Sequence, residues 1–189
     1  VYPVSEDWRA GPVGFRRVVR VRPSREAVYL AMAEVIAQRG TRARRQVGCI
    51  LVDEEGYILA SGYNGVATGR PHCREPGIPR CPGALLPSGV GLEFCEAIHA
   101  EQNAILRVGD PRKVHTVYCT ASPCIHCVKL LLGTGARRII FSEVYPHPTA
   151  REWWEKDHRE WLYLPKGWTL HYKSGSIPSG FFPPVPGEI

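Results

Sequence analysis

Two short segments decide the fold of this chain: Ile98-His99-Ala100-Glu101-Gln102-Asn103-Ala104-Ile105 and Pro123-Cys124-Ile125-His126-Cys127. Each follows an irregular stretch and opens a predicted helix. The i, i+3 spacing puts Cys124 and Cys127 on one side of a turn, where both can bind the same ion. One imidazole and two thiolates suit a tetrahedral zinc whose fourth position stays open to water. We therefore expect a zinc site formed by His99, Cys124 and Cys127.

The residues beside these ligands indicate hydrolytic chemistry. A helix N-terminus favours anions, so thiols placed there ionise more easily. Zinc lowers the pKa of a bound water toward about 7 and so makes hydroxide available at neutral pH. Glu101, two residues from His99 and not itself a ligand, is placed to move protons, whereas His126 is expected to face solvent or to support a ligand. The H-x-E…P-C-x-x-C arrangement is typical of zinc-dependent nucleobase deaminases.

Hydrophobic periodicity and turn residues place the other elements. A helix is predicted from Ser24 to Gly40, and its apolar face carries Val28, Ala31, Met32, Val35 and Ile36. A hairpin is predicted next, with strands at 47–53 and 57–63. The later elements are predicted to be helices at 99–108, 124–133 and 149–160 and strands at 114–120, 137–142 and 168–172. This alternation predicts an α/β fold, a three-layer α/β/α sandwich with a mixed sheet of about five strands.

The 189 residues are expected to form a single domain, residues 1–189, with a basic arm at 1–23 and a proline-rich tail at 173–189. No apolar run is long enough to span a membrane and no leader opens the sequence, so a cytoplasmic protein is expected, or one in the host cytoplasm if viral. The net charge of +6 arises within residues 1–45, which hold ten Arg and four acidic side chains. This charge either binds phosphate or belongs to a solvated arm or a subunit contact.

The segment 64–98 is predicted to be a long structured insertion, because eleven of its 35 residues are Gly or Pro. Its candidate soft ligands, four within 24 residues, are His72, Cys73, Cys81 and Cys95. The segment has too few large apolar residues to fold by burial alone, so we expect a second, structural zinc there, with free loop thiols as the alternative. One ion rarely takes two adjacent residues, so a ligand from 39–46 or a distant His is an alternative to His72.

These motifs resemble the deoxycytidylate (dCMP) deaminase family, within the cytidine-deaminase-like superfamily, over residues 22–172. The further segments that carry the resemblance are Arg22-Pro23-Ser24, Arg44-Arg45-Gln46-Val47-Gly48 and Gly62-Tyr63-Asn64-Gly65. The resemblance implies an enzyme that converts dCMP and water to dUMP and ammonia, supplying dUMP for dTTP synthesis. It assigns zinc to His99, Cys124 and Cys127 and proton transfer to Glu101. It also implies a homohexamer that dCTP activates together with Mg²⁺ and that dTTP inhibits.

The same resemblance assigns substrate and effector contacts. Substrate binding is expected of Asn64, which contacts the deoxyribose, of Ala100, and of Tyr145, which stacks on or borders the nucleotide. Effector or phosphate binding is expected of Gly65 and Arg45, because the family's effector site lies near the loop after the Gly-Tyr-Asn-Gly turn. Related deaminases also bind a second zinc in the insertion through Cys and His.

The chain departs from the family pattern at two positions. Ala43 stands where the family often has Cys, and Pro146 follows Tyr145 where many members have a basic residue. The phosphate contact is therefore expected from His147, from Arg151 or from an Arg of the 39–45 segment.

Four other functions compete with this prediction. The two zinc motifs also suit a tRNA adenosine deaminase or a 5-substituted dCMP deaminase, although the Gly-Tyr-Asn-Gly turn and the insertion favour an enzyme for mononucleotides. Free cytidine deaminases place Cys where His99 stands. A zinc-stabilised module that binds nucleic acid would explain the basic arm, but a structural zinc has no need of Glu101. We therefore expect no polynucleotide partner and no membrane partner.

Overall fold

The computed structural model describes residues 22–42, 44–73, 90, 94–145 and 147–166. Most of the basic arm, Cys81, the predicted strand at 168–172 and the tail at 173–189 lie outside them. The strands are β1 (Gly48–Val52), β2 (Ile58–Tyr63), β3 (Thr116–Cys119), β4 (Arg138–Phe141) and β5 (Glu160–Tyr163). The helices are α1 (Arg25–Ala37), α2 (Ala100–Ile105), α3 (Ile125–Leu132) and α4 (Pro148–Glu155), with a 3-10 turn at Pro111–Lys113.

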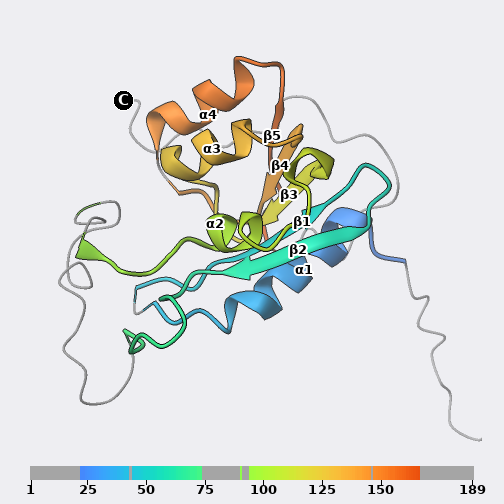
Figure 1. Cartoon of the computed structure of the whole chain (residues 1–189). Coiled ribbons are helices and arrows are strands. Elements are labelled where there is room, and N and C mark those ends of the chain that lie inside the picture. Colours follow the sequence, from blue (N-terminus) through green and yellow to red (C-terminus); the bar gives the residue numbers. More distant parts are fainter. Residues whose placement is uncertain (1–21, 43, 74–89, 91–93, 146, 167–189) are drawn as a thin grey trace, which may run out of the picture.

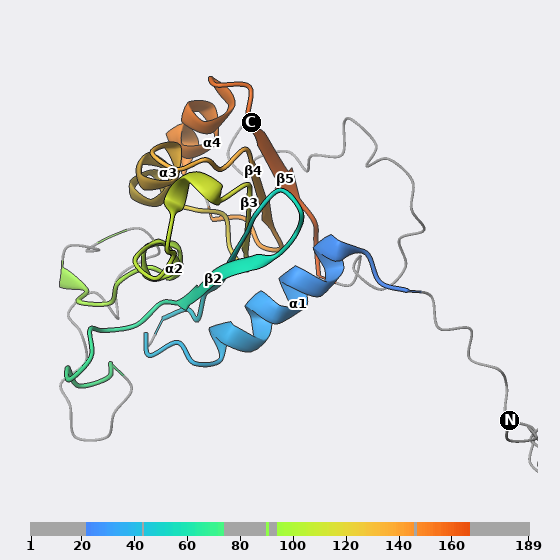
Figure 2. The same cartoon turned by 45° about the vertical axis from the view of Figure 1, so that its right-hand side comes forward.

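The five strands form one mixed sheet in the order β2-β1-β3-β4-β5. β1 runs antiparallel to β2 and to β3, whereas β3, β4 and β5 run parallel to one another. Parallel neighbours need crossover connections, and α3 and α4 supply them. Figures 1 and 2 show α1 on one face of the sheet and the other three helices on the opposite face. The prediction of a three-layer α/β/α sandwich is confirmed.

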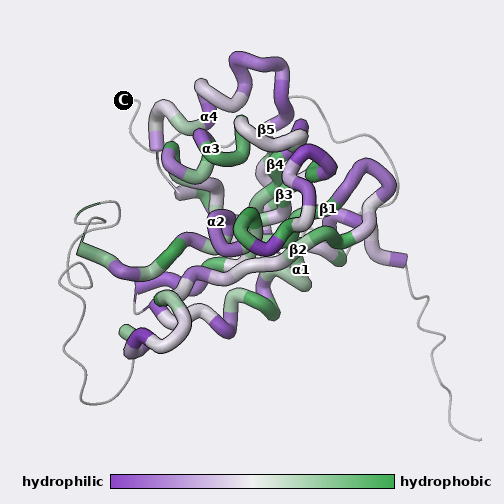
Figure 3. The backbone as a smooth tube through the Cα atoms, in the orientation of Figure 1, coloured by the Kyte–Doolittle hydropathy of each residue, from purple (hydrophilic) through white to green (hydrophobic). Residues whose placement is uncertain are grey.

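Helices cover both faces of the sheet, and alternate residues of β1, β3, β4 and β5 enter different cores. On β1, Ile50 packs toward α1, and Leu51 packs toward the other helices. The larger core, between the sheet and α2, α3 and α4, includes the fully buried Phe141 and Trp154. Figure 3 shows hydrophobic residues gathered on the central strands of the sheet. Within the described residues, no helix is long and apolar enough to cross a bilayer.

The apolar face of α1 was predicted correctly only in part, because Met32 and Ile36 pack against the core whereas Val28, Ala31 and Val35 are exposed. Ser24 caps the helix as expected, its side chain accepting a hydrogen bond from the Ala27 backbone amide. The residues buried against the sheet, however, are Ala27, Leu30, Ala33 and Ala37. Val28 and Val35 keep 40% and 64% of their surface exposed. Small alanines face the sheet because β1 lies so close that a methyl group at Gly48 would collide with the Ala33 carbonyl.

The helix predicted at 149–160 is shorter than expected, and the strand after it was missed. α4 ends at Glu155, and His158 adopts a positive φ of 56° that turns the chain back toward the sheet. β5 then pairs with β4 through residues 160–163. The Trp154 indole donates to the Glu160 carbonyl at 2.9 Å and fixes this corner. The bend has no Gly to mark it in the sequence, although His enters the left-handed region more readily than most residues.

Candidate active site and metal centre

His99 stands at the start of α2, where the local sequence fixes its backbone. It is the N-cap of the helix, and its amide donates to the Gln102 side chain at 2.9 Å. The Asn103 side chain, one residue further on, donates to the Tyr63 carbonyl at 2.9 Å and so ties α2 to the end of β2. Because α2 is held at both points, His99 and Glu101 of its first turn have a defined position at one end of the sheet.

Cys124 and Cys127 come from the start of α3, which meets the start of α2. Cys124 is the N-cap and Cys127 lies one turn further on. Their sulfur atoms lie 3.4 Å and 3.3 Å from Nδ1 of His99. All three ligand atoms lie within 4.8 Å of one another, and in the described part of the chain no other group of three such donors is found.

This donor set fits zinc. With Zn–S near 2.3 Å and Zn–N near 2.0–2.1 Å, two ligands of a tetrahedral ion lie about 3.5 Å apart. The separations between the His99 nitrogen and the two sulfurs are close to this value. Both cysteines are buried and His99 is half-buried, so little solvent competes for the site.

The electrostatics of the cluster also suit a cation. A hydrogen bond from Cys127 lowers the pKa of Cys124 to about 3, so this sulfur is already a thiolate. That sulfur in turn raises the pKa of His99. The Glu101 side chain is buried, and this burial raises its pKa, while the nearby His99 partly opposes the effect. Glu101 thus stands beside the three donors as a carboxyl that takes up a proton more readily than an exposed one.

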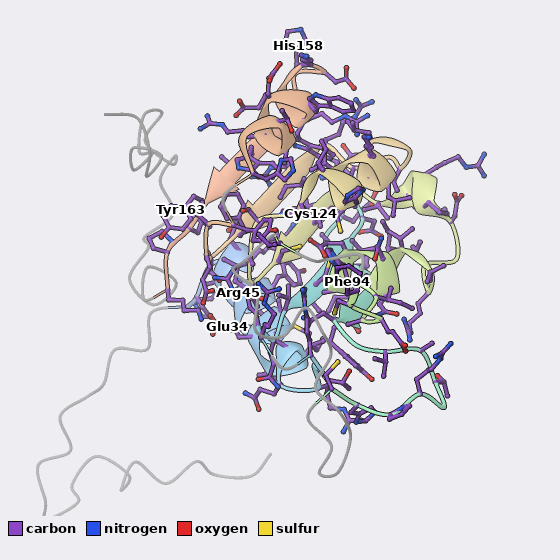
Figure 4. All side chains as sticks on the ribbon, turned by 90° about the vertical axis from the view of Figure 1, so that its left-hand side faces the viewer. Glu34, Arg45, Phe94, Cys124, His158 and Tyr163 are labelled. Carbon is purple, nitrogen blue, oxygen red and sulfur yellow. The ribbon has the colours of Figure 1, made fainter. Side chains whose placement is uncertain are left out.

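The cluster lies at one end of a pocket. Its lining residues are Arg42, Arg44, Arg45, Val47, Asn64, His99, Ala100, Glu101, Ala121, Ser122, Cys124 and Tyr145. Figure 4 labels Cys124, from the metal-binding cluster, and Arg45, from the basic wall, both of which line this pocket. The pocket therefore combines a metal-binding end with a strongly basic wall.

The basic wall is held in place by contacts on either side of the pocket. Arg45 pairs with Glu143 at 3.1 Å, and Glu143 also accepts a bond from Lys166 at 2.5 Å. Arg44 donates to the Val90 carbonyl at 3.2 Å. The Nε atom of Arg42 is buried and has no hydrogen-bond partner among the described residues. A buried donor of this kind is costly unless a ligand or water satisfies it.

Asn64 is buried beside the pocket, and much of its amide is used within the protein. Its Oδ1 accepts from the Val47 amide at 2.8 Å, and its Nδ2 donates to the Arg45 carbonyl at 2.6 Å. The side chain therefore holds the segment before β1 against the turn after β2. One amide hydrogen and one lone pair remain for a ligand.

The structure brings most of the sequence-predicted residues together. The pocket lining includes two of the three zinc ligands, His99 and Cys124, as well as Glu101, Arg45 and all three expected substrate residues, whereas the third ligand, Cys127, is fully buried. Of the phosphate candidates, three arginines of the 39–45 segment line it, and among the described residues His147 and Arg151 do not. His126 is exposed, in keeping with the expectation that it faces solvent.

Other predicted residues lie apart from the pocket. Gly65 pairs with Ile98 instead, through mutual backbone hydrogen bonds of 3.0 Å and 2.9 Å. His72 lines a separate hollow with Arg39 and Thr41, beyond the end of α1. Within the described residues, the second-zinc candidates form no three-donor group, and Cys81 lies outside them.

Sequence reasoning did not assign a role to Val47, Ala121 or Ser122, which also line the pocket. Val47 lies within a quoted motif, and Ala121 and Ser122 directly precede Pro123 of another, and that proximity was the one available signal. The partner of Ser122 could not be predicted, because it lies 23 residues further along the chain.

Comparison with known proteins adds independent evidence. The chain matches the cytidine and deoxycytidylate deaminase zinc-binding region over residues 23–143. It is 35% identical over 128 residues to the deoxycytidylate deaminase of Schizosaccharomyces pombe, covering 67% of this chain and 39% of that protein. It is 30% identical over 125 residues to the deoxycytidylate deaminase of Mycobacterium phage D29, covering 64% and 95%.

The fold agrees with these matches. The dCMP deaminase of cyanophage S-TIM5, solved in complex with dCMP and dUMP, superposes with a TM-score of 0.59 at 24% identity and covers 76% of this chain and 99% of that one. The chain spans about two fifths of the length of the two yeast relatives it matches. The matched region exceeds half of the chain and contains the three converging donors and Glu101, so the chain belongs to the cytidine and deoxycytidylate deaminase family.

Proposed function

We propose that the protein catalyses the zinc-dependent hydrolytic deamination of dCMP to dUMP and ammonia. The observation that carries this proposal is the convergence of His99, Cys124 and Cys127 beside the buried Glu101, in a pocket whose wall is basic. Relatives in yeast and in a mycobacterial phage are named deoxycytidylate deaminases, which supports the same substrate class. The reaction supplies dUMP, the precursor needed for dTTP synthesis.

His99, Cys124 and Cys127 would hold the zinc, which when bound supplies a water that ionises near neutral pH. Glu101 accepts a proton from the attacking water and delivers it to N3 of the cytosine ring. It then passes the second proton to the amine, which leaves as ammonia when the C4–N bond breaks. The water oxygen stays on C4. The burial that raises the pKa of Glu101 helps the carboxyl to hold each proton between transfers.

Glu101→Gln is expected to reduce turnover by at least about 100-fold, because a proton carrier in general acid–base catalysis contributes that much or more. The ligands are untouched, so the purified variant should retain its catalytic zinc. Ammonia release and metal content measured on the same sample check both parts. Glu160→Gln, which alters an ion pair with Arg138 at the far edge of the sheet, is the matched control. A Glu101→Gln enzyme with more than a tenth of the wild-type rate would show that another group carries the protons.

The basic wall supports a substrate with a 5′-phosphate. Arg42, Arg44 and Arg45 offer the geometry that binds phosphate oxygens in pairs. Arg42 is the sharpest candidate, because its buried Nε lacks a partner in the described structure. The remaining donor and acceptor of Asn64 are available to the deoxyribose, and the ring of Tyr145 borders the nucleotide. Other nucleobase deaminases on this scaffold, for tRNA adenosine or for 5-substituted dCMP, are the alternative.

We expect kcat/KM to be highest for dCMP, ahead of CMP, deoxycytidine, single-stranded DNA and tRNA. Arg42→Gln should lower kcat/KM for dCMP by about tenfold or more, the loss typical of a charge-assisted hydrogen bond. The same variant should leave kcat/KM for deoxycytidine, which has no phosphate, nearly unchanged. Arg138→Gln, outside the pocket, serves as the control. Faster deamination of tRNA or single-stranded DNA than of dCMP would replace the substrate assignment with a polynucleotide one.

We also propose a second, structural zinc held by Cys73, Cys81 and Cys95, with His72 or another residue as the fourth ligand. The motive is the density of soft ligands in an insertion with few large apolar residues. Metal analysis should then give about two zinc ions per chain. Cys81→Ser should lose one of them while the catalytic zinc stays bound, and Cys124→Ser should do the reverse. A wild-type zinc content near one ion per chain, with Cys73 and Cys95 freely reactive toward a thiol reagent, would show that the second site is absent.

We further propose a homohexamer that dCTP with Mg²⁺ activates and dTTP inhibits. The exposed Val28 and Val35 of α1 offer an apolar surface for a subunit contact. The hollow lined by Arg39, Tyr63 and His72, after the Gly-Tyr-Asn-Gly turn, supports an effector site.

Light scattering should therefore give a mass about six times the 21.1 kDa of one chain. Kinetics with dCMP should be sigmoidal and become hyperbolic with dCTP. Val35→Glu should lower the mass of the assembly, because it would bury a charge in the proposed subunit contact. Leu106→Glu, on the exposed end of α2, should leave that mass unchanged. A monomer whose rate of dCMP deamination does not change with dCTP or dTTP would contradict the proposal.

A further inference from the structure

Tyr145 forms part of the pocket from an irregular segment between β4 and α4. The ring is half-buried, and the groups whose charges act on its phenol are Cys124 and the arginines Arg42, Arg44 and Arg45. Tyr145 therefore shares the pocket with Cys124 and with all three arginines of the basic wall. No helix or strand holds Tyr145 there, so its position depends on local contacts.

Within the described residues, the hydrogen bonds to the backbone of Tyr145 come from one hydroxyl group, that of Ser122. The Tyr145 amide donates to Ser122 Oγ at 2.7 Å, and Ser122 Oγ donates back to the Tyr145 carbonyl at 3.1 Å. The Ser122 amide also donates to the Glu143 carbonyl at 2.8 Å. Ser122 thus joins the loop that enters α3 to the loop that leaves β4, beside the pocket.

The hydroxyl of Ser122 has no donor left for a ligand. A serine side chain has one O–H, and here it points to the Tyr145 carbonyl. Ser122 lines the pocket and is 96% buried, since only 4% of its surface is exposed. Its hydroxyl therefore acts on the pocket through Tyr145 and not by donating to a substrate.

We propose that Ser122 is a positioning residue that fixes Tyr145 against the bound nucleotide and so contributes to substrate affinity. This inference deepens the proposed dCMP deaminase function and names a residue that its chemistry does not require. A ring that packs on the nucleotide in both the ground state and the transition state contributes uniform binding, which appears in KM and not in kcat. Loss of the Ser122 hydroxyl should therefore raise KM and leave kcat nearly unchanged.

The chain offers a matched control in Ser142. Its hydroxyl donates to the Thr120 carbonyl at 3.1 Å, so it joins the same two loops as Ser122. Both serines have 4% of their surface exposed, and Ser142 is absent from the residues that line the pocket. Ser142→Ala and Ser122→Ala should lower thermal stability by similar amounts, and a loss of stability alone would affect both variants equally.

The first experiment tests the anchoring without any turnover. Hydrogen–deuterium exchange of the full-length protein, resolved to the Tyr145 amide, should show protection in the wild type and in Ser142→Ala. The same amide should exchange at least about tenfold faster in Ser122→Ala, because it loses its acceptor. Unchanged protection in Ser122→Ala would overturn the inference, whatever reaction the enzyme catalyses.

The second experiment tests the consequence for the substrate. Ser122→Ala should raise KM for dCMP by about tenfold, the loss expected from one or two net hydrogen bonds, with kcat within about twofold of the wild type. Ser142→Ala should keep the wild-type KM. In a double-mutant cycle, Ser122→Ala should add nothing once Tyr145→Ala has removed the ring, because both changes act on the same contact.

The outcomes separate the inference from the proposed function. A wild-type protein that leaves dCMP unchanged would refute the proposed function, while the exchange experiment still decides whether Ser122 anchors Tyr145. A wild-type protein that deaminates dCMP, with additive effects of Ser122→Ala and Tyr145→Ala, would show that Ser122 acts on the substrate by another route. A fall in kcat at constant KM would equally overturn a positioning role.

Discussion

The site depends on how closely α2 approaches β2 at Gly62. A methyl group there would collide with the Ala100 carbonyl and the Ala104 amide, so any side chain would push the helix outward. Because α2 begins at His99, its depth on the sheet sets where the imidazole and the Glu101 carboxylate stand. The two thiols come from α3, which lies on the same face of the sheet as α2. A small outward shift of α2 would separate Nδ1 of His99 from both sulfurs. The first glycine of the Gly-Tyr-Asn-Gly turn is thus a condition for the metal centre.

The sequence predicted the metal-binding end of the pocket well because its chemistry constrains residue type, spacing and helix position together. The layers of the fold followed from the alternation of strands and helices. Which face of α1 packs on the sheet could not be predicted, since the helix is apolar on both sides and only the close approach at Gly48 selects alanines for the inner face. The end of α4 was also missed, because the positive φ falls on His158 and not on a glycine.

The contacts that shape the rest of the pocket join residues far apart in the chain, and periodicity carries no information on such pairs. Asn64 bonds to Val47 and Arg45, 17 and 19 residues earlier. Ser122 bonds to Tyr145, 23 residues later. In each case a single buried side chain satisfies backbone groups of a loop that has no regular partner. The resemblance assigned Asn64 to the substrate, and the structure adds that this side chain first builds the wall against which a substrate would lie.

The distribution of charge in the pocket determines the orientation in which a ligand would bind. With zinc held by His99, Cys124 and Cys127, two thiolates and a divalent cation would cancel there, so a neutral base is the part of a substrate best suited to that end. Positive charge accumulates at the wall formed by Arg42, Arg44 and Arg45, where Glu143 pairs with Arg45 and also with Lys166. Half-exposed pairs of this kind contribute at most about 1 kcal/mol, so Glu143 orients Arg45 without cancelling its field. Under the proposed function, a molecule with an uncharged ring at one end and a phosphate at the other would bind in one orientation, with its ring beside Glu101.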